Sequence, residues 1–472
     1  MKAIIVLVAA ALALASASLA PALAAAAGQP VAIVGATIHT MSGPPIAGGV
    51  VVVDGRTIAA VGRPQDVAIP SGAQRIDAGG LDLYPGFIDA NTTLGLTEIG
   101  AVRATNDISE VGTLNPNARA EVAVNPSSEL IPVTRANGVL LALTAGRGGL
   151  ISGTSALIAL DGWTWEEMTV KAPVAMHVQW PGMGLDRSPE AKKEEEQIEA
   201  REKQLRELRE AFAAAAAYWR GRQAEGKAGV PRHDEDVVWA AMRPVVERKI
   251  PVAVEANDLM QIRAALDWSA EAGVDLILTG ARDAWRVAGE LARRRIPVIL
   301  DPVNALPARE FEPYDTPYAA AAKLQAAGVP VLFSTGAGSF GAANARNLPY
   351  EAAKAVAFGL PHDAAIRSLT LTAAEVLGVA DRLGSIDPGK DATLILVEGD
   401  PLETAGTQVR RAWIAGREID LHENRHQRLY EKYNSRPKPA AAPAAIAAPR
   451  PGAGSAGGGS TAADDSGSPV KH

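Results

Sequence analysis

Two kinds of apolar pattern divide the chain. Residues 31–84 carry short β-branched runs such as GGVVVVDGRTIAAVG between Gly and Pro turns, and the later runs DATLILVEGD and VRRAWIAGREI have the same character. Short runs of this kind, bounded by turns, are typical of an antiparallel sheet. We therefore predict a small composite β-sandwich domain built from residues 28–84 and 385–432, with the middle of the chain inserted between its halves.

The middle of the chain, residues 85–384, follows a different pattern. Eight apolar runs occur there, from GFIDANTTLGL to PVLFSTGAG, and amphipathic stretches such as DLMQIRAALDWSAEAG separate the later ones. Strands that alternate with helices are typical of parallel sheets with crossover connections. The pattern predicts an α/β fold with a (β/α)8 TIM-type barrel, whose functional groups follow the strand ends. A doubly wound open sheet is the alternative.

One segment interrupts this alternation. Residues 189–227 are rich in charge and carry apolar residues at steps of seven, three, four and seven positions. This stripe consists of Ile198, Leu205, Leu208, Phe212 and Trp219. The spacing places these side chains along one side of a long helix. Two roles are open for this helical insert: a helix packed against the barrel, or a lid or arm that docks a partner.

The two ends of the chain differ from this folded region. Residues 1–27 place one Lys before an apolar run of about a dozen residues and then small residues, which is the pattern of a secretory signal peptide. Because the run is too short to span a bilayer, we expect export to the periplasm or beyond, with no membrane span in the mature chain. Residues 433–472 are rich in Pro, Ala, Gly and Ser, and such a tail is expected to be disordered.

Composition narrows the classes of function. The 472 residues are 47% hydrophobic and 21% charged, which is a globular balance with ample material for a core. A net charge of -7 offers no overall attraction to nucleic acid, so we expect a small-molecule or protein partner. The absence of cysteine excludes disulfides, thiolate zinc sites and a cysteine nucleophile.

Three stretches of the chain form a recognisable set: the opening IVGATIHTMSG with GVVVVDGRTIAAVG, the run LYPGFIDANTTLGL, and the closing LTLTAAEVLGVADRLGSIDPGKDATLILVEGDPLE. Together they resemble the amidohydrolase superfamily. The resemblance covers roughly residues 31–430 and is strongest to the imidazolonepropionase-like and dipeptidase-like branch. It implies a metal-dependent hydrolase, using zinc or another divalent cation, that acts on non-peptide or dipeptide C–N bonds.

The positions that hold the metal in this family carry other residues here. Family members normally end the first barrel strand with His-x-His, and Asn91 and Thr93 stand in those positions. Amide and hydroxyl oxygens are far weaker zinc ligands than neutral imidazole. The run PVAMHVQWP supplies His177 and Gln179 where the family has a bridging carboxylated Lys or Glu. The usual ligands of the first strands are therefore missing.

The later strands continue this loss. The run PVAVEAND supplies Glu255 and Asn257 where the family has a fifth-strand His. Thr279 stands in the sixth-strand run, and Thr335 and Gly336 fall where an eighth-strand Asp is usual. Since the whole ligand set is replaced, we expect no metal and no other cofactor. The candidate ligand-binding residues are Asn91, Thr93, His177, Gln179, Glu255, Asn257 and Thr335.

Three weaker signals stay open. A new cation site from Glu98, His177, Glu255 and Asp301 is an alternative, although a lone His in an apolar strand is more often structural. The stretch GAGSFG, residues 336–341, matches G-x-G-x-x-G but closes the predicted barrel, so it is either a tight turn or an anion-binding loop. Arg147 either meets a carboxylate at the barrel mouth or is solvated on a turn.

Two functions follow from these observations. The sequence favours an exported, non-catalytic amidohydrolase homologue that binds a small molecule in the barrel mouth or supports a partner. That partner would be a second copy of the chain or an active amidohydrolase. The alternative is a hydrolase of C–N bonds, in cyclic amides or dipeptides, that works with an altered metal site. Fold alone does not decide between them.

Overall fold

The computed structural model describes residues 29–227, 229–230, 232 and 234–437. The described residues from 29 to 428 form one compact unit, and the described residues from 429 to 437 belong to a second. The predicted signal peptide and the tail from residue 438 onward lie outside the described residues. Helix α14 (Arg425–Asn434) includes residues 433 and 434, so the tail predicted to begin at residue 433 starts inside a helix.

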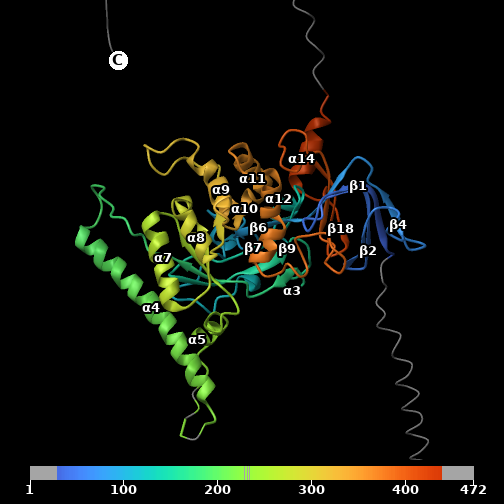
Figure 1. Ribbon diagram of the computed structural model, residues 1–472. Helices are drawn as coiled ribbons and strands as arrows, with labels where there is room; N and C mark the ends of the chain where they lie inside the picture. The colour runs from blue at the N-terminus through green and yellow to red at the C-terminus, as the bar shows by residue number, and fades with distance from the viewer. Residues whose placement is uncertain (1–28, 228, 231, 233, 438–472) are drawn as a thin grey trace, which may run out of the picture. The chain divides into compact units, whose positions relative to one another are not determined.

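An eight-stranded sheet combines strands from both flanks of the chain. Its strands are β1 (Val31–Ile38), β2 (Ile46–Asp54), β3 (Thr57–Gly62), β4 (Gln74–Asp77), β5 (Asp82–Pro85), β16 (Leu394–Glu398), β17 (Gln408–Ile414) and β18 (Arg417–Ile419). The order is β18-β17-β16-β5-β1-β2-β3, and β4 pairs with β1. Strands β5 and β16 pair antiparallel, so strands from the two flanks of the chain lie side by side in one sheet. Figure 1 shows the early strands β1, β2 and β4 in the same part of the molecule as the late strand β18. The predicted domain boundaries themselves stay a prediction.

The sheet is stable because both of its faces are covered. On one face, side chains such as Ile33, Val51 and Trp413 pack into a buried cluster. On the other face, Val50 and Val52 pack with Val67, which follows β3. The continuous valine run of β2 therefore belongs to a strand that is buried on both sides, and its pattern is not the strict alternation of a half-exposed strand.

The middle of the chain forms two further sheets. One contains β8 (Ile151–Thr154), β11 (Met176–Gln179), β12 (Val252–Ala256), β13 (Leu276–Gly280), β14 (Val298–Leu300) and β15 (Val331–Phe333). The other contains β6 (Phe87–Thr92), β7 (Val139–Thr144), β9 (Ala156–Ala159) and β10 (Thr169–Lys171). Neighbouring strands from β11 to β15 are parallel, as are β6 and β7. A parallel bridge between Thr92 and Gly336 connects β6 to the residues after β15.

The prediction of parallel strands is wrong for one run, which is antiparallel to both of its neighbours. Strand β9 runs antiparallel to β7, and β8 runs antiparallel to β11. Only Ser155 separates β8 from β9, so a single extended run passes between β7 and β11. The connection from β7 to β8 is too short for the dozen or more residues that a parallel crossover requires. The parallel strands β11 to β15 confirm the α/β fold class. The run formed by β8 and β9 is the exception to their common direction.

Helices follow the later strands on the outside of the sheets (Figure 1). They are α7 (Leu259–Ala272), α8 (Ala288–Arg294), α9 (Thr316–Ala326), α10 (Ser339–Ala343), α11 (Leu348–Ala357), α12 (His362–Leu369) and α13 (Leu371–Val376). Helix α7 illustrates their local causes, because Asp258 and Gln261 form a capping box at its start and Gly273 ends it with a φ of 66°. The remaining helices are η1 (Arg103–Thr105), η2 (Ala120–Ala123), α2 (Leu130–Arg135), α3 (Trp165–Met168), α5 (Val237–Ala241), α6 (Arg243–Val246), η3 (Ala284–Val287) and η4 (Ala345–Asn347).

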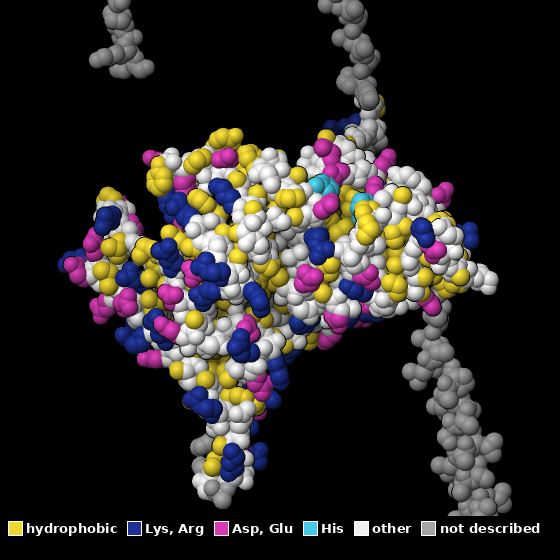
Figure 2. All heavy atoms as spheres, in the orientation of Figure 1, with side chains coloured by type: hydrophobic (Ala, Val, Ile, Leu, Met, Phe, Trp, Pro, Cys, Tyr) yellow, Lys and Arg dark blue, Asp and Glu magenta, His cyan; other side chains and the backbone are white. Residues whose placement is uncertain are grey.

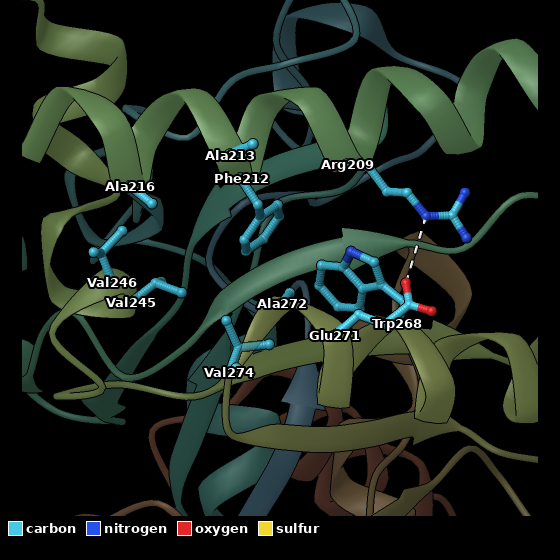
Figure 3. Close-up of a pocket in the computed structure, with 11 residues that line it drawn as sticks. Arg209, Phe212, Ala213, Ala216, Val245, Val246, Trp268, Glu271, Ala272 and Val274 are labelled. Carbon is cyan, nitrogen blue, oxygen red and sulfur yellow. Dashed lines mark ion pairs between the residues drawn. The ribbon is translucent and has the colours of Figure 1, made fainter.

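The long helical insert contains α4 (Glu194–Ala224), which is shorter at both ends than the predicted range. Its central apolar residues face α6 and α7 (Figure 3). Leu205, Leu208 and Phe212 are buried, whereas Ile198 is 39% exposed. The Phe212 ring meets the edge of Trp268 with centroids 4.9 Å apart. Of the two roles left open for the insert, the structure favours a helix packed against its neighbours.

Surface charge is mixed. Acidic and basic side chains are interspersed over the face seen in Figure 2. Among the described residues, no helix combines the length and the apolar character needed to cross a membrane.

Candidate functional site

Several predicted site residues lie at neighbouring strand ends. In the ladders, Gln179 is opposite Glu255, and Glu255 is opposite Thr279. Residues in register on parallel strands point to the same side of a sheet, and residues two apart on one strand share a face. His177 therefore lies one step behind Gln179 on the same face of β11. The structure brings these side chains into one row across β11, β12 and β13.

Glu255 is paired with an arginine. Nη2 of Arg147 donates to both carboxylate oxygens of Glu255 at 2.7 Å, and Nη1 donates to the Ala337 carbonyl at 3.3 Å. The two side chains are 34% and 28% exposed, respectively. A guanidinium that grips both oxygens of a carboxylate fixes its orientation as well as its charge. Of the two roles left open for Arg147, the structure shows the one that meets a carboxylate.

Asp89 is a buried acid that sequence reasoning missed. The Thr335 hydroxyl donates to Oδ2 of Asp89 at 2.5 Å, and the backbone amides of Asn91 and Thr335 each reach Oδ1 at 3.3 Å. Burial outweighs these hydrogen bonds and, helped by the charge of Asp301, raises the pKa of Asp89 to about 7. The signal was present, because Asp89 lies two residues before Asn91 and so shares its face of β6.

The GAGSFG stretch is a tight turn that leads into α10, which begins at Ser339. Gly336 has a φ of +82°, and a Cβ there would lie 3.0 Å from Cδ of Pro302. A Cβ on Gly341 would lie only 2.0 Å from the Gly336 carbonyl oxygen. The Gly338 amide donates to Oγ1 of Thr93 at 3.1 Å. Since this amide already has a partner, the geometry supports the turn over the anion-binding loop.

These contacts form what we call the strand-end network. It consists of Asp89, Thr93, Arg147, Glu255, Thr335, Ala337 and Gly338. Each polar side chain in it bonds to another member of the network, which is the usual condition for a buried polar cluster that stabilises a fold. The network ties the ends of β6, β7, β12 and β15 to one another.

The divalent metal that the family implies does not fit these residues. The carboxylate of Glu255 is held by a guanidinium, the Thr93 hydroxyl accepts an amide hydrogen, and Gly336 offers no side-chain donor. Across residues 29–437, the described positions contain no group of three or more His, Cys, Asp or Glu that could hold a metal ion. The alternative cation site from Glu98, His177, Glu255 and Asp301 is therefore not formed.

His177 is isolated within the fold. The side chain is buried, and its Nε2 atom has no hydrogen-bond partner in the described part of the chain. Burial lowers the pKa of His177 to about 4, so the imidazole is neutral at physiological pH. Its surroundings are those of a structural histidine, and the expectation that such a residue would be hydrogen-bonded does not hold for this nitrogen.

A cavity of about 360 Å³ lies at the carboxyl ends of β12, β13 and β14. We call it the strand-end cavity. Its polar lining includes Asn257, Arg282 and Asp301, and its apolar lining includes Leu300, Val303, Ala305, Leu306, Pro317 and Ala320. Asn257 is the predicted site residue found in this lining, and the other six candidates lie elsewhere. Burial, with the charge of Glu255, raises the pKa of Asp301 to about 6.

The wall of this cavity is held by ion pairs. The Arg309 guanidinium donates to Asp283 at 3.0 and 2.6 Å and to Glu312 at 2.6 Å, and Arg286 donates to Glu312 at 2.7 Å. Although burial opposes it, hydrogen bonding from Arg309 keeps the pKa of Asp283 below its usual value. Asp283 also accepts the Leu259 amide at 3.1 Å, which links the loop before α9 to the start of α7.

Known proteins share this fold. An amidohydrolase family model matches residues 310–419. A protein from Hapsidospora irregularis described as amidohydrolase tasK is 24% identical over 371 residues, which are 74% of this chain and 37% of that protein. A solved amidohydrolase from Thermotoga maritima MSB8 has a TM-score of 0.73 at 24% identity, covering 83% of this chain and 99% of its own. The structure of phenylurea hydrolase B has a TM-score of 0.51 at 18% identity, and the match covers 83% of this chain and 97% of that protein's chain.

These findings define a mixed α/β protein with a fold of the TIM-barrel type. The match of the amidohydrolase family model to residues 310–419 and the similarity to amidohydrolase tasK confirm the resemblance to the amidohydrolase superfamily inferred from the sequence. The chain spans only 37% of the length of the Hapsidospora relative. At identities below 25%, the solved structures speak for the fold and not for a shared activity.

Proposed function

We propose that this protein is a non-catalytic amidohydrolase homologue that binds a small organic molecule in the strand-end cavity. The observation that carries this proposal is the pairing of Glu255 with Arg147. In the family's hydrolases, a metal lowers the pKa of bound water to about 7. Here Glu255, the carboxylate at the family's fifth-strand metal position, is neutralised by the Arg147 guanidinium. The neighbouring metal positions carry amide or hydroxyl side chains, or, at Gly336, no side chain.

The strand-end cavity supports a binding role. Its volume of about 360 Å³ falls within the roughly 300–1,000 Å³ of small-molecule sites. Such sites are mostly apolar, with a few polar groups that orient the ligand, and this lining has the same balance. Its position beyond the carboxyl ends of parallel strands is the usual place for ligands in α/β folds. We also propose that the strands close into the eightfold barrel of the family.

A hydrolase of C–N bonds, such as those of cyclic amides or dipeptides, is the second candidate. The raised pKa of Asp301, about 6, favours it, because a carboxyl group that titrates near neutrality in a cavity suits general acid or base catalysis. Asp89, with a pKa of about 7, is fully buried and out of reach of a substrate. The second candidate thus has one accessible acid and no evident means of activating water.

Metal content and turnover separate the two candidates. The protein would be purified without chelator, its metal measured by plasma emission, and its activity on amide and dipeptide panels recorded before and after addition of zinc or manganese. We expect far less than one metal per chain and no turnover. Near-stoichiometric metal with metal-dependent turnover, abolished in Glu255→Gln but retained in the control Glu290→Gln on α8, would establish the hydrolase instead.

Location and partners are further parts of the proposal. We propose that residues 1–27 direct export to the periplasm or medium, and N-terminal sequencing of protein recovered from each cell fraction tests this. A homo-oligomer or a complex with an active amidohydrolase is proposed through the exposed side of α4, where Ile198 lies. Light scattering of the purified chain measures whether it self-associates.

A further inference from the structure

The strand-end cavity contains one cationic group that is not neutralised. Arg282 is exposed, lines the cavity, and forms no ion pair with any residue that the structure describes. Its neighbours behave differently, because Arg286 and Arg309 both donate to Glu312 on the same side of the cavity. Arginines that stabilise a loop find carboxylates within the chain. A guanidinium left unpaired at a cavity wall is available to a ligand.

A second polar group lies at the same strand ends. Asn257 follows β12, and its side chain sits over Gly280, whose added Cβ would lie 2.7 Å from Oδ1 of Asn257. Gly280 also has a φ of +74°, so this position combines a left-handed backbone with the room that the amide occupies. The Asn257 amide and the Arg282 guanidinium are thus two hydrogen-bond donors in the lining of one cavity.

We propose that the strand-end cavity binds a small organic monocarboxylate with an apolar body, its carboxylate held by Arg282 and Asn257. This inference rests on the proposed binding function and names the class of its ligand. A planar guanidinium fork matches the two oxygens of a carboxylate. The apolar wall formed by Leu300, Val303 and Leu306 accommodates the remainder of the molecule.

The charges of the cavity argue against other ligand classes. Asp283 and Glu312 are neutralised by Arg309 and Arg286, so Arg282 and the partly buried Asp301 are the charged groups of the lining that form no ion pair with a described residue. A dianion such as a phosphate ester would bring a second negative charge that no lining residue neutralises. An organic cation would meet Arg282 directly. A carboxylate without an apolar body would leave the apolar wall in contact with water.

The test compares matched probes by isothermal titration calorimetry. Phenylacetate carries the carboxylate, and phenylacetamide is its neutral counterpart. Phenyl phosphate keeps the ring but changes the charge, and acetate keeps the carboxylate but lacks the ring. We expect phenylacetate to bind at least tenfold more tightly than each of the others. Arg282→Gln should abolish this preference, and Arg282→Lys should keep part of it, since lysine keeps the charge but loses the fork. Arg293→Gln, which removes an exposed charge from α8, should change nothing.

The outcomes separate the ligand class from the binding function. If phenylacetate and phenylacetamide bind equally well and the cavity-filling Ala305→Trp blocks both, the proposed preference for a carboxylate is wrong. The strand-end cavity remains the binding site in that case. Tighter binding of phenyl phosphate would likewise overturn the class. Binding that Ala305→Trp leaves intact, or no binding of any probe, would overturn both the ligand class and the strand-end cavity as the site. Circular dichroism of each variant establishes that the fold is retained.

Discussion

The strand-end network and the strand-end cavity lie at neighbouring strand ends and meet at β12, yet their polar groups are arranged in opposite ways. In the network, Arg147 is bound to Glu255, and Asp89 to Thr335. In the cavity, Arg282 and Asn257 line open space, and two of the acids near them, Asp283 and Glu312, are held by other arginines. The first region uses its polar groups to stabilise the fold, whereas the second keeps two of them available.

This difference separates structural from ligand-binding polar groups without reference to any motif. Three residues at the family's metal positions, Thr93, Glu255 and Thr335, belong to the network, which is internally bonded. Of the two free donors, Asn257 directly follows β12 near the family's fifth-strand position, and Arg282 lies in a loop that carries no family motif. Because a bonded group must lose its partner before it can bind a ligand, unbonded groups at a cavity wall are the better candidates. The following predictions test this comparison, from the largest expected effect to the smallest.

Asp89 should control how stability varies with pH. Its pKa is about 7 in the folded protein against 3.8 for a free side chain, so the folded state keeps a proton that the unfolded state has released. Stability from this group is therefore present at low pH and falls as pH rises from about 4 to about 7, by up to about 4 kcal/mol. In Asp89→Asn this dependence should vanish when urea denaturation is repeated across that range. Profiles that run parallel to wild type, as expected for the exposed control Asp54→Asn, would refute the assignment.

Restoring the family's eighth-strand Asp should destabilise the network. In Gly336→Asp, the backbone of a residue that carries a side chain must adopt a φ of +82°. Its Cβ would also lie about 3.0 Å from Pro302. We expect a loss of about 3 kcal/mol in the free energy of unfolding and no gain in metal binding. Gly338→Ala is the control, since its φ is also positive but no atom lies within 4 Å of the added Cβ. Equal losses in the two variants would assign the whole effect to backbone conformation and none to the contact with Pro302.

The pair of Arg147 and Glu255 should be coupled. Arg147→Met leaves a carboxylate beside Asp301, and Glu255→Gln leaves a guanidinium with half of its contact, so each should cost about 1–2 kcal/mol given that both side chains are about one-third exposed. The double variant should cost less than the sum of the two. Strict additivity in denaturant titrations would show that the pair does not act as a unit.

Arg282 should matter least for stability. It makes no ion pair with a described residue, so Arg282→Gln should change the free energy of unfolding by less than about 0.5 kcal/mol. Thermal unfolding of wild type and variant, compared with Arg147→Met, measures this contrast. A loss as large as that of Arg147→Met would place Arg282 among the structural arginines and remove the distinction between the two regions.

Much of the fold was predictable because apolar patterns report burial. The runs from GFIDANTTLGL to PVLFSTGAG became strands, and the stripe of residues 189–227 became α4. The direction of each strand was harder to predict from the sequence. The apolar pattern of the run around Ser155 is the same whether the strand is parallel or antiparallel to its neighbours. The connection from β7 to β8 contained the missing information, because it is too short for a parallel crossover.

The site was predictable only in part. Family positions directed attention to Asn91, Thr93 and Glu255, and the structure places the last two in the network. Asp89 could have been found from its spacing of two residues from Asn91. Arg282 could not, because an arginine in a loop has no sequence signature of being unpaired. That property depends on where Arg309 and Arg286 lie, which only tertiary structure fixes.

The left-handed backbone at Gly336 also limits the mutational routes open to this chain. An aspartate introduced there alone meets a strained backbone and the ring of Pro302. Histidines introduced at residues 91 and 93 would still find Glu255 bound to Arg147. Each single substitution toward a metal-binding set therefore either strains the fold or leaves the Arg147–Glu255 pair in place. A metal-binding set at these positions requires several substitutions at once.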